Sequence, residues 1–259
     1  MDSTGLHGFV AELIVRRNAR YNSPQNLRVL NSESKSLLKN PNTTSADANG
    51  RGSISSLTEE ALLDAVRVLC RRDPDLRRVV KQFGPPPLWA REPGFSTLIH
   101  IILEQQVSLA SARAAHNRLI DLARPMTPRR FLKFDDATLK ACGFSRQKTA
   151  YCRHLAESII KRNLEIEGLA LLEDEDVKSE LEKIKGIGRW TSDIYLLMVL
   201  RRPDIWPRGD LALATAAHEV KRLERRPTYD ELDSLSIAWR PWRAVAARIL
   251  WHHYLSRRR

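Results

Sequence analysis

The chain has 259 residues, of which 42% are hydrophobic and 29% are charged, and its formal net charge at pH 7 is +12. That length can enclose the core of one large domain or two small ones, whereas no apolar run approaches the roughly 18–20 residues of a membrane span. The 3 cysteines are widely spaced, which argues against a zinc or iron–sulfur site. Their odd number, without a recognisable signal peptide, favours a reducing compartment. We therefore expect the cytoplasm or nucleoid of a bacterium, or the nucleus of a eukaryote.

The positive charge needs a physical reason, because self-repulsion disfavours a compact state. Nucleic acid is the commonest reason, since each neutralised phosphate releases condensed counterions. A generally basic protein, for example one associated with ribosomes, is the alternative. The composition thus favours a nucleic-acid partner and no membrane partner, and we expect a monomer.

The first 53 residues differ in composition from the rest of the chain. They are rich in Ser, Asn and Arg, and beyond Tyr21 they show little periodicity. Residues 1–53 are therefore interpreted as a flexible or disordered tail, and residues 54–259 as the folded domain. The acid-poor stretch 5–30 would also suit an organellar transit peptide, although an extension without such a role is the simpler interpretation.

From Ser56 onward the apolar residues recur at helical spacing, and no repeated strand pattern is visible. The first predicted helix gathers apolar residues on one face: Leu62, Ala65, Val66 and Leu69. Ser56 or Thr58 can cap its N-terminus. Residues 95–108 are mostly apolar and predict a core helix. The pattern indicates an all-α fold.

Short polar residues mark the starts of the next predicted helices, since their side chains can accept hydrogen bonds from first-turn N–H groups. These expected N-caps are Ser108, Thr127, Asp135 and Ser145. The last of them begin helices over residues 127–134, 135–142 and 145–162, with a stop at Cys142-Gly143. Further helices are expected over residues 173–185, 189–202, 211–223, 229–238 and 241–255.

A tight turn is predicted at Gly186-Ile187-Gly188, after a helix that ends at Lys185 and before one that begins near Arg189. Glycines permit a positive φ and a close approach of neighbouring groups, and Ile187 can plug the core. The N–H groups of the turn lie at a helix N-terminus, where the helix dipole favours an anion such as a DNA phosphate. A plain corner between two helices is the alternative.

A loop that contains Pro and Gly leads into Asp210, which is expected to start a helix. An aspartate at that place is often only an N-cap. However, Asp210 follows the hairpin by one helix and one loop. This order resembles the superfamily of DNA glycosylases defined by a helix-hairpin-helix, a Gly/Pro-rich loop and an Asp.

Two other segments extend this resemblance, Ile102–Ala112 near its start and Arg240–Trp251 near its end. The likeness therefore covers about Leu57 to Tyr254. It implies two helical subdomains with a DNA-binding cleft between them, and an enzyme of base excision repair.

Trp190 stands where the lyase-type members, similar to endonuclease III, carry a lysine that attacks the sugar. The chain also lacks the four-cysteine cluster of many such members. In both respects it resembles the alkylpurine branch, that of 3-methyladenine DNA glycosylase II. The resemblance implies a monofunctional hydrolase that removes purines of the 3-methyladenine and 7-methylguanine type from double-stranded DNA.

Cleavage of an N-glycosidic bond builds positive charge on the deoxyribose, and a carboxylate near C1′ stabilises that charge. Asp210 is the candidate catalytic carboxylate, which can also orient or deprotonate the attacking water. Trp190 and Trp251 match aromatic positions of the branch, where an electron-rich pocket favours a cationic flipped base. Core packing is the alternative for both. Ile194 stands where the branch often has tyrosine, which implies a narrower range of bases.

The resemblance also implies how DNA is held. A side chain fills the gap that a flipped base leaves, and Gln106 is the candidate wedge, with local hydrogen bonding as its alternative role. The implied phosphate contacts are Gly186, Gly188, Arg189, Thr191 and Arg208. No cofactor is required and no side-chain metal site is expected, but the family's hairpin holds a monovalent cation (Na⁺ or K⁺) through main-chain carbonyls, here around 184–188.

Two other functions stay open at this point. One is a glycosylase for a different lesion, such as hypoxanthine or another deaminated base, which a panel of lesions would reveal. The other is a non-catalytic helix-hairpin-helix module that only holds duplex DNA. That module predicts phosphate contacts but no role for Asp210.

Overall fold

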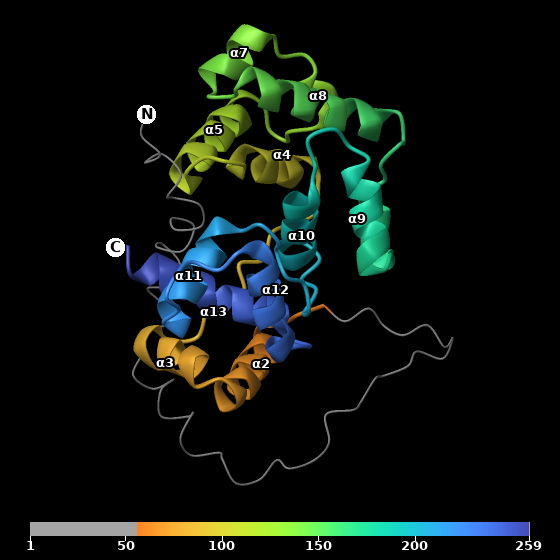
Figure 1. The fold of residues 1–259 in the computed structure, drawn as a ribbon. Coiled ribbons are helices and arrows are strands. Elements are labelled where there is room, and N and C mark those ends of the chain that lie inside the picture. The colour runs from red at the N-terminus through yellow and green to blue at the C-terminus, as the bar shows by residue number, and fades with distance from the viewer. Residues whose placement is uncertain (1–55, 259) are drawn as a thin grey trace, which may run out of the picture.

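The computed structural model describes residues 56–258, and the predicted tail, residues 1–53, lies outside the described residues. Every regular element within the described part is helical, which confirms the all-α prediction. Figure 1 shows α4, α5, α7 and α8 grouped at one end of the molecule and α2, α3, α11, α12 and α13 at the other. Helix α10 packs against both α9 and α4, and it lies between the two groups.

The first subdomain comprises α4 (Phe95–Glu104), α5 (Leu109–Leu122), α6 (Pro128–Phe131), α7 (Asp136–Ala141) and α8 (Arg146–Ile160). The second subdomain comprises α2 (Glu59–Arg72), α3 (Pro74–Phe83), α11 (Leu211–Lys221), α12 (Tyr229–Ser236), η3 (Ile237–Trp239) and α13 (Arg243–Ser256). The connecting segment holds η2 (Glu167–Leu171), α9 (Asp174–Glu182) and α10 (Arg189–Met198). The predicted pair of helical subdomains is therefore present.

The predicted helix starts are confirmed, because each N-cap side chain accepts a hydrogen bond from a first-turn N–H group. These residues are Thr58, Ser108, Thr127, Asp135 and Ser145. The apolar face predicted for α2 is also the buried one. Local patterns thus determine where these helices begin and which way they face.

Four predicted helix ends lie three or four residues too far along the chain, namely those of the helices predicted over residues 95–108, 127–134, 173–185 and 189–202. Two of them bear on the site. The helix predicted over 95–108 ends at Glu104, because Gln106 adopts a left-handed φ of 55° that a helix cannot continue through. The helix predicted to end at Lys185 ends at Glu182, because the chain already turns toward the hairpin. Both ends lie in segments where the chain changes direction.

Helix α3, Pro74–Phe83, is missing from the sequence prediction. Asp73 caps it by accepting from the N–H of Leu76 at 3.3 Å, and the same carboxylate binds distant partners. Lys221 Nζ lies 2.7 Å from Asp73 Oδ2, and Trp239 Nε1 donates to that oxygen at 2.8 Å. Asp73 therefore joins the start of α3 to α11 and η3.

Helix α13 forms the centre of the second subdomain, where it packs against α2, α3 and α11. Its Arg248 is 0% exposed, and desolvation lowers the pKa of this guanidinium to about 9. Arg248 donates to the carbonyls of Leu88 at 2.9 Å and Leu197 at 2.7 Å. Because Leu197 belongs to α10, this buried arginine fixes α10 against α13.

Candidate active site

Asp210 caps α11, as predicted, and its carboxylate receives hydrogen bonds from three directions. Oδ1 accepts from the N–H of Leu213 at 2.8 Å and from Trp251 Nε1 at 3.2 Å. Oδ2 accepts from Trp190 Nε1 at 3.0 Å. The fold thus brings together the predicted carboxylate and both predicted tryptophans, which come from α10 and α13.

This carboxylate lies in a dry environment. Asp210 is 3% exposed, Trp251 is fully buried and Trp190 is half-buried. Desolvation raises the pKa of Asp210, while the hydrogen bonds from Trp190, Leu213 and Trp251 oppose that shift. A carboxylate with so little water around it interacts strongly with a positive charge that approaches it.

The two glycines of the hairpin differ in backbone conformation and in the space beside them. Gly186 has a φ of +95°, and a Cβ there would lie 2.1 Å from Cγ of Tyr151, so only glycine fits. Gly188 caps α10 with an ordinary φ of −109° and has open space beside it. Ile187 is 4% exposed, which confirms that it plugs the core. The freedom predicted for both glycines is therefore required only at Gly186.

The loop between α4 and α5 lies against the hairpin. Gln105 Nε2 donates to the carbonyl of Gly186 at 2.8 Å and to Thr191 Oγ1 at 2.9 Å. Gln106, the candidate wedge, is exposed and left-handed. Sequence reasoning gave no separate role to Gln105, whose contacts join residues far apart in the chain. The loop and the hairpin therefore form one continuous surface.

The predicted phosphate contacts differ in their accessibility. The Arg189 side chain is 56% exposed. Arg208 forms ion pairs with Asp230, at 2.5 Å, and with Asp233 of α12. Thr191 is 2% exposed, and its hydroxyl is already a hydrogen-bond acceptor within the protein. Contacts of these residues with DNA stay predictions.

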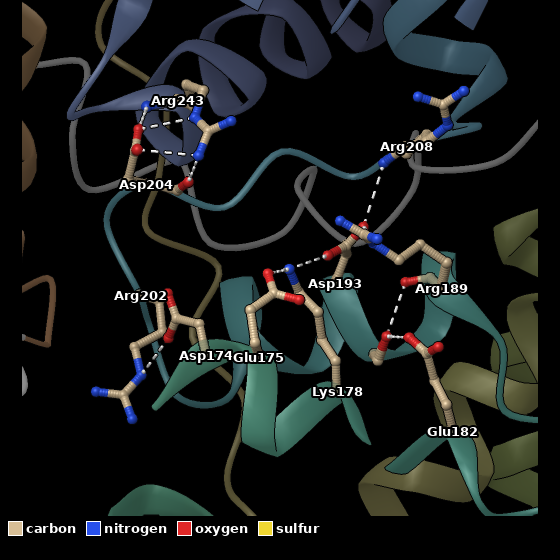
Figure 2. Close-up of polar contacts among 11 residues, drawn as sticks. Asp174, Glu175, Lys178, Glu182, Arg189, Asp193, Arg202, Asp204, Arg208 and Arg243 are labelled. Carbon is tan, nitrogen blue, oxygen red and sulfur yellow. Dashed lines mark hydrogen bonds and ion pairs between the residues drawn. The ribbon is translucent and has the colours of Figure 1, made fainter. Parts of the chain in front are cut away.

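A buried acid of α10, Asp193, was not singled out in the sequence. Figure 2 shows its carboxylate between Lys178 of α9, Arg189 and the main chain of Arg208. The available signal was an acidic residue in an otherwise apolar helical stretch, since such a side chain is rarely buried without partners.

No metal site stands out in the described residues. They contain no group of three or more His, Cys, Asp or Glu side chains placed to hold a metal ion. Nor does any described helix have the length and apolar character needed to cross a bilayer.

Comparisons with known proteins fit this geometry. Residues 99–242 match the family of HhH-GPD superfamily base excision DNA repair proteins. The chain is 31% identical to an alkylbase DNA glycosidase-like protein of Schizosaccharomyces pombe over 183 residues, which is 67% of this chain and 84% of that protein. It is 30% identical to DNA-3-methyladenine glycosylase 1 of the same yeast over 186 residues, or 69% of this chain and 82% of that protein.

Solved structures give the same result. The 3-methyladenine DNA glycosylase of Schizosaccharomyces pombe, in complex with abasic DNA, superposes with a TM-score of 0.69 at 30% identity over 73% of this chain and 95% of that one. The DNA-3-methyladenine glycosidase of Bacillus halodurans does so with a TM-score of 0.60 at 28% identity over 72% of this chain and 87% of that one. The chain belongs to the HhH-GPD superfamily of base excision DNA repair proteins.

Proposed function

We propose that this base excision repair glycosylase is monofunctional and hydrolyses the N-glycosidic bond of alkylated purines in duplex DNA. The observation that carries the proposal is the Asp210 carboxylate, held by the indole N–H groups of Trp190 and Trp251. The relatives named for 3-methyladenine support the same substrate class.

Asp210 supplies the negative charge that this reaction needs. As the bond from C1′ to the base breaks, the sugar becomes positively charged, and a nearby carboxylate lowers the energy of that state. The N–H groups of Leu213 and of the fully buried Trp251 hold the carboxylate in place, so it needs little reorganisation when the charge develops. The same oxygens can orient the attacking water or accept its proton.

The aromatic neighbours explain the preference for alkylated bases. A purine alkylated at N3 or N7 carries a positive charge, which the face of an indole ring attracts. Such a base also leaves readily, so the site needs no strong general acid. Because Trp251 is fully buried and Trp190 only partly so, we expect Trp190 to shift when a flipped base reaches Asp210.

Position 190 also supports a monofunctional reaction. The group that contacts Asp210 Oδ2 from this point of α10 is an indole nitrogen, which is a hydrogen-bond donor and not a nucleophile. With water as the nucleophile, the product is an abasic site in an intact strand. We therefore expect no covalent enzyme–DNA adduct when borohydride is added during turnover.

The hairpin and the α4–α5 loop are the proposed DNA-binding surface. The N-terminus of α10 and the exposed Arg189 would hold phosphate groups, and Gln106 would enter the gap in the duplex. We also propose that the hairpin holds a monovalent cation. The carbonyls of Ile184 and Gly186 each accept one hydrogen bond, and a carbonyl oxygen has a second lone pair to offer.

The proposal is tested by single-turnover release of methylated bases from methylated duplex DNA. Wild type is compared with Asp210→Asn, and with Asp136→Asn as a control for the loss of an exposed carboxylate in the other subdomain. We expect release by wild type and the control, and a loss of at least about 100-fold in Asp210→Asn with DNA binding retained.

Other outcomes would overturn parts of the proposal. If wild type releases hypoxanthine or another deaminated base but no methylated purine, the substrate class is wrong. If no lesion in the panel is released and Asp210→Asn binds DNA as wild type does, the chain acts as a binding module.

A further inference from the structure

Asp193 lies one helical turn beyond Trp190 on α10, and it is 1% exposed. Its Oδ2 accepts the main-chain N–H of Arg208 at 3.3 Å (Figure 2). Arg208 precedes Asp210 by two residues. Helix α10 therefore holds the end of the Pro–Gly loop twice, once at the main chain of Arg208 and once at the Asp210 carboxylate.

The residue between these two attachments is Gly209. It has a φ of +83°, and a Cβ added there would meet no atom within 4 Å, so nothing packs against this joint on that side. A glycine linkage rotates easily. The Asp210 N–H also donates to the Pro207 carbonyl at 3.4 Å, and the Arg208 side chain pairs with Asp230 and Asp233 of α12. Neither of these contacts holds the main-chain N–H of Arg208. The hydrogen bond to Asp193 restrains the other side of the joint.

The cations near Asp193 do not form a close ion pair with it. Lys178 Nζ lies 3.6 Å from Oδ1, and Arg189 Nε lies 3.5 Å from Oδ2. Lys178 is shared with the exposed Glu175, at 2.7 Å. Desolvation nevertheless outweighs these cations and raises the pKa of Asp193 to about 6. A buried acid whose pKa is raised destabilises the fold when it is ionised.

We propose that Asp193 is a positioning residue, which anchors the main chain at Arg208 and so aims the Asp210 carboxylate before DNA binds. This inference rests on the proposed glycosylase function of Asp210. Its essential element is a hydrogen-bond acceptor at position 193. If Asp193 served only in an ion pair between α9 and α10, its effect would depend on its charge. Its substitution would then lower stability rather than the rate of base release.

Two substitutions separate these roles. Asp193→Leu keeps the branched shape, in a larger side chain, and removes the acceptor. Asp193→Asn removes the charge and keeps an oxygen that can accept the Arg208 N–H. Asp174→Asn is the control, since Asp174 of α9 pairs at 3.1 Å with Arg202, which lies six residues before Arg208 (Figure 2). The full-length chain is used throughout.

We measure the single-turnover rate of methylated-base release at saturating enzyme, the Kd for an abasic-site duplex, the Tm and amide hydrogen exchange. Asp193→Leu should lower the rate about 10- to 100-fold, as the loss of a supporting hydrogen bond does in other sites. Its Kd should change less than about threefold, and the Arg208 amide should exchange faster. Asp193→Asn should recover most of the rate and the protection, and Asp174→Asn should match wild type.

Several results would overturn the inference: a wild-type rate in Asp193→Leu, equal losses in the Leu and Asn variants, or a rate loss matched by losses of Tm and affinity. Unchanged protection of the Arg208 amide in Asp193→Leu would also overturn it. The exchange measurement needs no activity. If the protein releases no base, the proposed function is refuted. The exchange rate of the Arg208 amide in Asp193→Leu still shows whether Asp193 anchors this main-chain group.

Discussion

Trp251 Nε1 lies 3.2 Å from Asp210 Oδ1, although the two residues stand 41 positions apart in the chain. The same ring packs against Trp89, with 6.4 Å between ring centroids. Trp251 thus has a polar contact with the candidate carboxylate and an apolar contact with the core. The two roles predicted as alternatives, in the site and in core packing, are therefore compatible in one side chain.

Replacing Trp251 by Phe should separate these roles. The ring still packs, but the N–H to Asp210 is lost, so we expect excision to fall about tenfold while DNA binding is retained. Trp239→Phe is the matched control, because it removes an equivalent hydrogen bond to another buried carboxylate, that of Asp73. It should lower the Tm and leave the rate unchanged. Equal losses of rate, binding and Tm in Trp251→Phe would favour a packing role alone.

The rate of excision should depend on pH through Asp210. Burial raises the pKa of this carboxyl above its ordinary value of about 3.9, and only the ionised form can stabilise the sugar. The rate should therefore fall as pH decreases through that raised pKa. Single-turnover rates at a series of pH values, with folding monitored by circular dichroism, test this. A flat profile down to pH 4 in a folded enzyme would count against Asp210 as the acting anion.

The same shift has the opposite sign for stability. Because the folded pKa of Asp210 lies above the unfolded one, its contribution to stability is full below the unfolded pKa and is lost as pH rises through the folded pKa. Asp210→Asn should consequently be at least as stable as wild type at pH 7. Thermal unfolding at pH 5 and pH 7 measures this, and a large loss of Tm in Asp210→Asn at pH 7 would contradict it.

The two hairpin glycines should respond differently to alanine. Gly186→Ala forces a strained φ and a clash with Tyr151, so unfolding free energy should fall by about 2–4 kcal/mol. Gly188→Ala meets open space at an ordinary φ and serves as the control, with a much smaller change. Urea unfolding measures the free energy of unfolding of both variants. Equal losses would mean that the close approach of Tyr151 to Gly186 does not contribute to the cost of the substitution.

Gln106→Ala should reduce excision more than binding. An exposed side chain on a left-handed residue contributes little to folding, so the expected effect lies in the population of flipped bases. Fluorescence of 2-aminopurine beside the lesion reports flipping, and it should fall together with the rate. An unchanged signal and rate would remove Gln106 as the wedge.

Local signals predicted much of the fold. The N-caps at Ser108 and Ser145 were readable because a capping residue acts on the turn that immediately follows it. Asp73-Pro74 carries the same signal for α3, yet the strongly charged sequence around it hid the helix. At the early end of α4, Gln105 is extended and hydrogen-bonded to the hairpin, and Gln106 is left-handed.

The site was predicted only as far as its individual residues. The resemblance pointed to Asp210, Trp190 and Trp251, but not to the hydrogen bonds that join them. Asp193 was not predicted as a site residue, because its proposed role depends on a hydrogen bond from the main-chain N–H of Arg208. The pattern of side chains in the sequence does not reveal such a contact. Contacts that depend on how α10 meets the loop require the assembled fold.

With the roles proposed for Asp193 and Asp210, these two buried acids place heat resistance in conflict with base excision. Each is a carboxyl whose ionised form the fold holds at some expense, since burial raises both pKa values. A random library of this chain selected only for survival of heating would therefore enrich neutral residues at both positions. The selected variants would fold well and bind DNA, but they would not excise damaged bases.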